Sequence, residues 1–259
     1  MQYRGKTALI TGASSGIGAA FAQALAQRGM DLVLVARSRD QLQAVANEAS
    51  RTYGVRAEVI VADLSHADAI ARVQSEVARL GLSIHMLVNN AGFATHGVFD
   101  GLDAAREQEQ VAVNIAVVVA LTRAFLPPMV NQGDGAIVNV ASIAAWQPTP
   151  YSAVYGASKA FVLSFSEALA VENRHRGVRV LALCPGRTET GFFAVAGINT
   201  SRRGGRSPEQ VAETALHALE RGQSAVVDGA YNTVLTTAVG LLPRAWAARL
   251  AGWRLRPRA

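Results

Sequence analysis

The sequence is poor in cysteine, aromatic residues and charge, and its composition excludes several classes of protein. Its 259 residues include one cysteine, Cys184, which rules out an internal disulfide and fits a reducing compartment. Aromatic residues make up 6% and charged residues 17%, whereas half of the residues are apolar, which indicates a folded chain with a sizeable core. The first apolar run, at residues 7–11, is too short for a secretory signal. We therefore expect a cytoplasmic protein.

Lysine is also scarce: the chain has 23 arginines but only two lysines, Lys6 and Lys159. Lys159 follows Tyr155 by four residues, in the stretch YSAVYGASKAF. In a helix, residues four apart lie on the same face, so these two side chains can approach one another. An ammonium beside a phenol favours the phenolate and lowers the phenol pKa, as acid–base catalysis requires. Arginine cannot give up a proton at this position, so the spacing predicts a catalytic pair.

The positive charge is concentrated in the C-terminal part. The net charge is +6, and the last 16 residues, RAWAARLAGWRLRPRA, contain five arginines and no acid. With Trp246 and Trp253 interleaved, this segment has the composition of one that lies on an anionic membrane or touches nucleic acid. The simpler interpretation, which we favour, is a solvated helix whose tryptophans pack on the core or on a partner subunit. We therefore expect no nucleic-acid partner and keep a membrane-surface contact as the alternative.

One apolar stretch, residues 111–130, has the length of a membrane span. It contains Asn114 and Arg123, and a charge within the hydrocarbon layer is costly. We expect a helix buried between a sheet and a neighbouring helix or subunit.

Short apolar runs alternate with helix-length amphipathic segments along residues 1–259. This order predicts a Rossmann-like α/β fold, in which one doubly wound parallel sheet has helices on both faces. A glycine-rich, polar segment at about 186–206 is typical of a substrate lid, and a basic C-terminal extension covers about 230–259. No linker or repeat divides the chain, so we expect a single domain. The expected strands are residues 7–11, 31–36, 55–62, 84–89, 135–142 and 178–185, with a further one near SAVVDG.

The sequence TGASSGIG, residues 11–18, joins the first expected strand to the first expected helix. At such a junction, free backbone N–H groups and the helix dipole attract an anion. Gly12 permits the turn, Gly16 lets a pyrophosphate approach, and Gly18 lets the helix pack on the strand, so we expect a dinucleotide site. The second strand ends in Ala36-Arg37 without an acid, which favours NADP(H) over NAD(H) because arginine accommodates a 2′-phosphate. The alternative is that Arg37 starts a helix in solvent.

Ser142 lies at the expected end of the fifth strand, where ligands of open α/β sheets bind. Its hydroxyl is suited to holding a carbonyl oxygen on which charge develops.

Together these motifs resemble the classical short-chain dehydrogenase/reductase family over about residues 5–190. The resemblance rests on TGASSGIG, Asp63, NNAG at 89–92, Asn114, Ser142, the Tyr155-x-x-x-Lys159 pair and PGRTET at 185–190. It implies an oxidoreductase in which Tyr155 is the general acid/base, Lys159 lowers its pKa and contacts the nicotinamide ribose, Ser142 orients the carbonyl, and Asn114 holds a relay water.

The resemblance also assigns a cofactor site, with Asp63 on the adenine, Asn90 near the adenine ribose, and Thr188 and Thr190 on the nicotinamide side. The expected cofactor-binding residues are Gly12, Ser14, Ser15, Gly16, Ile17, Gly18, Arg37, Asp63, Asn90, Ala91, Tyr155, Lys159, Pro185, Gly186, Thr188 and Thr190.

The expected substrate is a small carbonyl compound or alcohol, such as an apolar ketone or a 3-oxoacyl compound, because Ile143, Trp146, Phe192 and Phe193 suggest an apolar cleft. The histidines lack metal-ligand spacing, so no metal is expected. We expect a homo-oligomer, either a dimer or a tetramer. The alternative function is a cofactor-binding regulator of the same fold without turnover, against which the complete catalytic set argues.

Overall fold

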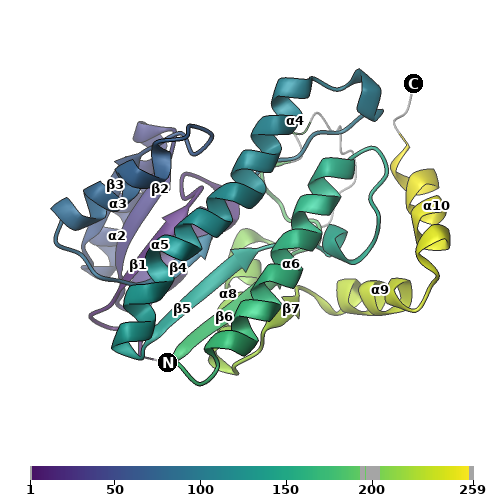
Figure 1. The fold of residues 1–259 in the computed structure, drawn as a ribbon. Helices are drawn as coiled ribbons and strands as arrows, with labels where there is room; N and C mark the ends of the chain where they lie inside the picture. The colour runs from purple at the N-terminus through teal and green to yellow at the C-terminus, as the bar shows by residue number, and fades with distance from the viewer. Residues whose placement is uncertain (1, 193–195, 197–204, 257–259) are drawn as a thin grey trace.

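The computed structural model describes residues 2–192, 196 and 205–256, and is built on one seven-stranded parallel sheet (Figure 1). Its strand order is β3-β2-β1-β4-β5-β6-β7. From β1 the chain adds strands toward one edge of the sheet, and from β4 it adds strands toward the other edge. In such a sheet, the crevice at the carboxyl ends of the two central strands is the ligand-binding position. The strands are β1 (Thr7–Thr11), β2 (Asp31–Ala36), β3 (Ala57–Val61), β4 (Ile84–Asn89), β5 (Gly135–Val140), β6 (Val178–Cys184) and β7 (Ala225–Val227).

The predicted α/β fold is confirmed, with three strands whose bounds differ. β3 runs from Ala57 to Val61 rather than over 55–62, and β5 and β6 end at Val140 and Cys184. The residues that follow, Ala62, Ala141 and Pro185, have low strand propensity, and proline has no backbone N–H for the ladder. Ser142 therefore lies two residues beyond its strand.

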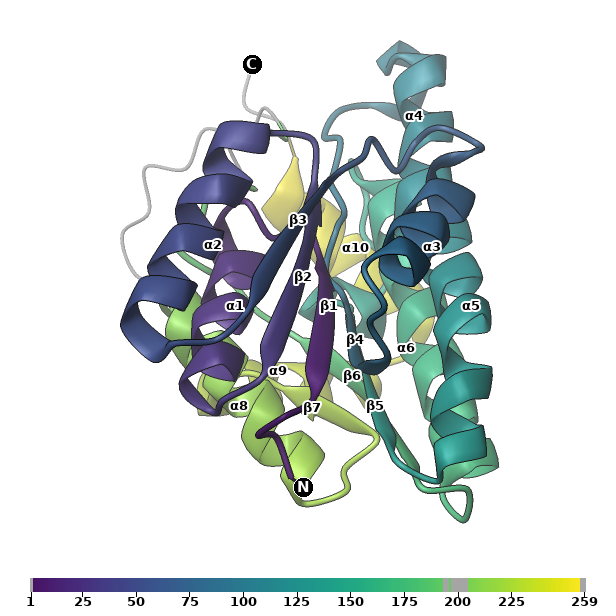
Figure 2. The ribbon, with the colours of Figure 1, turned by 90° about the vertical axis from the view of Figure 1, so that its left-hand side faces the viewer.

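Helices cover both faces of the sheet (Figure 2). On one face lie α1 (Gly16–Gln27), α2 (Arg39–Tyr53) and α8 (Pro208–Glu220), and on the other α3 (Ala69–Arg79), α4 (Ala104–Val111), α5 (Val117–Gln132) and α6 (Ala153–Asn173). Alternate strand residues face opposite layers, since Ile10 packs with the first group and Leu9 with the second. Two short 3-10 turns, η1 (Phe99–Gly101) and η3 (Ile143–Trp146), line the carboxyl edge.

The expected buried helix is confirmed. A π turn, η2 (Ala112–Ala116), joins α4 to α5, and the resulting helix, Ala104–Gln132, is long and apolar enough by composition to cross a membrane. Its inner face instead packs on the sheet through Val117, Leu121, Phe125 and Met129, in one cluster with Leu87 of β4 and Ile137 of β5.

The C-terminal extension forms two further helices, α9 (Ala230–Gly240) and α10 (Arg244–Leu255), which lead away from the β7 edge of the sheet (Figure 1). Trp246 and Trp253 are 62% and 86% exposed, so the expectation that they pack on this chain's core is wrong. The cause is the orientation of α10, whose inner face consists of Ala247, Ala251 and Gly252, the last lying against Pro150.

Replacing Leu121 by alanine tests the burial of α5. Leu121 is fully buried, so we expect Leu121→Ala to lower the free energy of unfolding by about 2–5 kcal/mol in urea denaturation. Val119→Ala, on the exposed side of the same helix, is the control and is expected to cost less than about 1 kcal/mol. Equal effects of the two changes would contradict the packing described here.

Candidate active site

The turn between β1 and α1 is shaped to receive an anion. Gly12 has a φ of 63°, a conformation that side chains disfavour. A Cβ added to Gly18 would lie 2.3 Å from the Gly12 carbonyl oxygen, so the first turn of α1 needs glycine there to pack against the turn. The N-cap residue of α1, Ser15, makes no side-chain capping hydrogen bond, which leaves backbone N–H groups at the helix start available to a phosphate.

Hydrogen bonds from the β4 loop fasten this turn. The Thr11 hydroxyl accepts from the backbone N–H groups of Asn90 and Ala91, each at 3.0 Å. The Asn90 side-chain amide donates to the carbonyls of Thr11 at 2.9 Å and Gly12 at 3.1 Å. The Asn90 amide thus holds the turn in place, and its expected contact near the adenine ribose stays a prediction. Sequence reasoning missed Thr11, although it is the first letter of the glycine motif.

Arg37 and Asp63 lie near one another beyond β2 and β3. Burial by itself raises the Asp63 pKa, but hydrogen bonds from the backbone and hydroxyl of Ser65 and the charge of Arg37 hold that pKa below its usual value. Ser65 donates to one Asp63 oxygen through its backbone at 3.0 Å and its hydroxyl at 2.7 Å. Arg37 is exposed at the start of the loop before α2, so its guanidinium is free to reach a ligand phosphate.

Ser142 and Tyr155 meet on the far side of the same crevice. Ser142 caps η3, its hydroxyl accepting from the Ala144 N–H at 3.1 Å, while Tyr155 lies in the first turn of α6. Burial raises the pKa of Tyr155 to about 12, although a hydrogen bond with the Ser142 side chain lowers it. The ring of Phe192 lies 5.6 Å from that of Tyr155, centroid to centroid, and supplies part of an apolar wall.

Lys159 is 4% exposed, and its amine donates to the Val140 carbonyl at 2.7 Å. Burial lowers the pKa of this amine to about 8. Its Nζ lies 5.8 Å from the Tyr155 ring centroid. Burial disfavours both the phenolate and the ammonium, and it is the largest influence on the pKa of each group. The role of Lys159 in lowering the Tyr155 pKa stays a prediction.

Asn114 lies in the π turn, where its side-chain oxygen accepts from the Phe93 N–H at 3.1 Å and its amide donates to the Phe93 carbonyl at 3.0 Å. The amide also donates to the Ser158 hydroxyl at 3.1 Å, and this hydroxyl donates to the Tyr155 carbonyl at 2.7 Å. A Cβ added to Gly92 would lie 2.9 Å from the Asn114 oxygen and 3.5 Å from Lys159 Nζ. The Asn114 oxygen and the Lys159 amine thus both lie next to the Cα of Gly92. Ser158 was missed, although it immediately precedes the conspicuous lysine.

The loop after β6 packs against the glycine turn between β1 and α1. Thr190 Cγ2 lies 3.0 Å from where a Gly16 Cβ would be, and buried Thr188 forms a parallel bridge with Arg206. The Pro185 carbonyl accepts from the Ile143 N–H at 3.0 Å, and a Cβ on Gly186 would lie 2.1 Å from the Asn232 amide nitrogen of α9. The expected lid residues Phe193, Arg202 and Arg203 lie outside the described residues.

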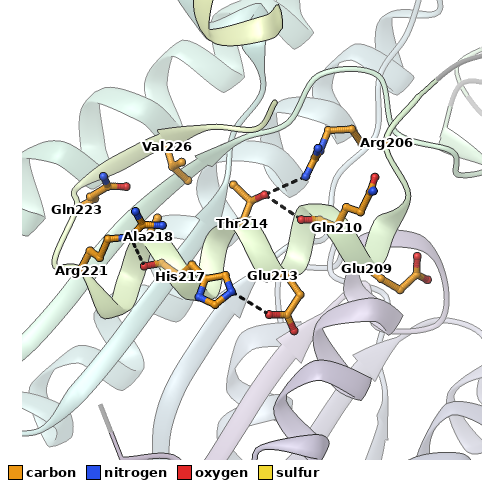
Figure 3. Close-up of a pocket in the computed structure, with 10 residues that line it drawn as sticks. All are labelled: Arg206, Glu209, Gln210, Glu213, Thr214, His217, Ala218, Arg221, Gln223 and Val226. Atoms are coloured by element: carbon orange, nitrogen blue, oxygen red, sulfur yellow. Dashed lines mark hydrogen bonds and ion pairs between the residues drawn. The ribbon is translucent and has the colours of Figure 1, made fainter. Parts of the chain in front are cut away.

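A separate open hollow of about 610 Å³ runs along α8 and the β7 edge (Figure 3). None of the predicted site residues lines it. Its charged groups pair with neighbours: Arg206 Nε lies 2.8 Å from a buried Asp228 oxygen, and Glu213 contacts both Arg28 and His217. The hollow therefore presents a surface of mixed charge, and the predicted site residues lie elsewhere.

Comparison with known proteins agrees with this geometry. The family model for short chain dehydrogenase matches residues 6–199. Hydroxysteroid dehydrogenase-like protein 1 of Gallus gallus is 38% identical over 220 residues, covering 83% of this chain and 65% of that protein. The very-long-chain 3-oxoacyl-CoA reductase of Anas platyrhynchos is 39% identical over 186 residues, covering 70% of this chain and 59% of that protein. The chain thus spans less than two thirds of the length of these two relatives.

Among solved structures, a short-chain dehydrogenase from Sphingobium yanoikuyae in complex with NADPH superposes with a TM-score of 0.83 at 34% identity, covering 98% of this chain and 96% of that one. The match over residues 6–199, the strand order and the tyrosine, lysine and serine gathered at the sheet edge agree, and the chain belongs to the short-chain dehydrogenase family of oxidoreductases.

Proposed function

We propose that this protein is an NADP(H)-dependent oxidoreductase that transfers a hydride between nicotinamide and a carbonyl or secondary alcohol. The observation that carries the proposal is the meeting of Ser142, Tyr155 and Lys159 in one buried crevice beside the glycine turn. A phenol that retains its proton, next to a hydroxyl that can hold an oxygen, is suited to protonating a forming alkoxide.

The residues present fit such a cofactor. The uncapped start of α1 and the glycine cradle at Gly12 and Gly18 suit a pyrophosphate, and Arg37 suits a 2′-phosphate. Lys159 and Thr188 are the residues that we assign to the nicotinamide half. When bound, the nicotinamide supplies or accepts the hydride. The NADPH complex of the Sphingobium relative supports the choice of cofactor.

The chain's own residues handle the proton. In carbonyl reduction, the Ser142 hydroxyl orients the carbonyl oxygen and the Tyr155 hydroxyl gives its proton to that oxygen. Lys159, when protonated, stabilises the phenolate that remains. Asn114 borders the same space as the Lys159 amine and can hold a water there, so that a proton can return to Tyr155 from solvent.

An apolar ketone or 3-oxoacyl compound is the substrate class that the site supports best. Phe192 and the Ile143–Trp146 turn supply apolar surface next to Ser142 and Tyr155. The names of the matched relatives, a hydroxysteroid dehydrogenase-like protein and a very-long-chain 3-oxoacyl-CoA reductase, point to bulky apolar compounds. Consumption of NADPH with a panel of 3-oxoacyl thioesters, steroid ketones and aryl ketones identifies the substrate. A cytoplasmic location and a homo-oligomeric state remain predictions.

Removing the Tyr155 hydroxyl tests the catalytic assignment. We expect Tyr155→Phe to lower kcat for ketone reduction by about 10²–10⁴-fold, because the proton donor is lost. NADPH affinity, measured by quenching of protein fluorescence, should stay within about threefold of the wild type because binding depends on other groups. Tyr151→Phe is the matched control, four residues earlier, and is expected to retain activity. Wild-type turnover by Tyr155→Phe would exclude the role, and a wild-type protein without turnover on the whole panel would favour the regulatory alternative.

Replacing Arg37 tests the cofactor preference. We expect Arg37→Gln to raise the KM for NADPH by about 10–100-fold, the value of a lost charge-assisted contact of about 1.5–3 kcal/mol. The KM for NADH should change little, since NADH lacks the 2′-phosphate. Arg39→Gln, at the first position of α2, is the control for general charge. An equal rise for both cofactors would contradict 2′-phosphate recognition.

The pH dependence of reduction follows from the two buried groups. Because burial holds the pKa of Lys159 to about 8, the stabilising cation is present below that pH and is lost above it. Tyr155, with a pKa of about 12, stays protonated throughout. We expect kcat/KM for reduction to fall as pH rises through about 8. A profile that stays flat to pH ~10 would contradict the amine's role.

A further inference from the structure

The C-terminal helices carry a large apolar surface that this chain leaves uncovered. We call it the tail surface, and its exposed apolar residues are Tyr231, Val234, Leu241, Leu242, Trp246, Leu250 and Trp253. Soluble monomers rarely expose so many large apolar side chains in adjoining segments without a binding role. Residues 229–259 also contain five arginines and no aspartate or glutamate.

On α10, the apolar residues form a single stripe. Trp246, Leu250 and Trp253 are spaced at i, i+4 and i+7, so they lie on one side of the helix. The opposite side holds Ala247 and Ala251, both buried against the protein. The tryptophans therefore point away from the body of the molecule, and a flat partner can approach them without any rearrangement.

Arginines border this stripe on both sides. At 3.6 residues per turn, Arg254 falls on one side of it and Arg249 on the other. Both are exposed, as is Arg256 just after the helix. Indole rings prefer the boundary between lipid headgroups and acyl chains, while arginine stems lie along apolar surface and bring the guanidinium to phosphates. The arginines lie beside the tryptophan stripe, on the same side of the helix. This arrangement fits a shallow contact with a membrane surface that is held partly by charge.

A second copy of this chain fits the tail surface less well. A two-fold contact through α10 would place the same arginines opposite one another. Between residues 229 and 256, the described part of the tail, no acid is present to pair with them. A nucleic-acid duplex would neutralise the arginines, but its bases are stacked inside it, so the tryptophan stripe would lack an apolar neighbour. An anionic bilayer satisfies both the charge and the apolar stripe.

The tail surface also adjoins the site. The helix α9 packs on η3, and Gly252 of α10 lies against Pro150, so both helices contact the segment between Ser142 and Tyr155. We propose that the tail surface docks this protein on anionic phospholipid bilayers and brings that segment close to the membrane. The docking depends on surface charge and exposed side chains, and it is independent of the proposed catalysis.

Co-sedimentation of the full-length protein with lipid vesicles tests the docking. We expect binding to phosphatidylcholine vesicles that contain about 30% phosphatidylglycerol, and much weaker binding to pure phosphatidylcholine. Raising NaCl from about 0.1 M to about 0.5 M should weaken binding, because salt screens the arginine contribution. Two of the three tryptophans lie in the tail, so their emission should shift to shorter wavelength on the anionic vesicles.

Paired variants separate the two contributions. Arg249→Gln with Arg254→Gln should weaken partitioning by about tenfold or more, since each arginine near an anionic surface contributes about 1 kcal/mol. Trp246→Ala with Trp253→Ala should abolish the emission shift and weaken partitioning by about tenfold. Matched controls are Arg72→Gln with Arg79→Gln on α3, and Val171→Ser, which is 75% exposed on α6. These controls should bind vesicles like the wild type.

Four outcomes would overturn the proposal. The first is no sedimentation with anionic vesicles, and the second is equal loss of binding in the tail variants and the controls. The third is that the tryptophan variant dissociates an oligomer in analytical ultracentrifugation, which would assign the surface to a second copy. Duplex DNA that competes fully with vesicles at the same salt would likewise assign it to nucleic acid. NADPH consumption measured on the same samples reports the proposed catalysis separately.

Discussion

One buried amine, that of Lys159, holds the site together. It joins the end of β5, through the Val140 carbonyl, to the first turns of α6, and it borders the space that Asn114 reaches from the π turn. An arginine would bring five donors and a permanent charge into a space that offers the amine one described carbonyl acceptor. A lysine can lose its proton there, and its pKa of about 8 shows how close it is to doing so. The retention of lysine in so arginine-rich a chain follows from this balance.

The crevice exists because the chain changes direction between β1 and β4. Thr11 ends β1 and Asn90 follows β4, and their mutual hydrogen bonds hold the glycine turn against the NNAG loop. The same loop carries Gly92, whose missing side chain leaves the space between Asn114 and Lys159. The π turn in the long helix then aims Asn114 into that space, a use of π turns that recurs at functional sites. The NNAG loop, residues 89–92, therefore connects the glycine turn to the space beside Asn114 and Lys159.

The parts of this arrangement that depend on local pattern could be predicted from the sequence. Apolar periodicity located the strands, and the spacing of glycines and of Tyr155 and Lys159 located the two ends of the crevice. What depends on desolvation could not be predicted, since spacing shows that a phenol and an amine are near but not how much water is removed from them. The exposure of Trp253 could not be predicted either. It depends on which face α10 turns toward the protein, and that face holds Ala247 and Ala251. The ion pair between Arg206 and Asp228 could not be predicted either. These two residues lie on either side of α8 and β7 in the sequence, and the packing of these elements brings them together.

The tail is joined to the candidate site by a chain of contacts. Asn232 of α9 occupies the position where a side chain on Gly186 would lie, and it donates to the Asp228 carbonyl at 2.6 Å. Asp228 pairs with Arg206, which bridges Thr188 beside the catalytic crevice. The chain fixes α9 firmly, yet it leaves Trp246 and Trp253 of α10 62% and 86% exposed. Covering an indole with a partner surface would contribute up to several kcal/mol to binding, by the usual value of about 25 cal/mol per Å². Among the surfaces considered, an anionic bilayer is the one that rewards both the indoles and the arginines that flank them.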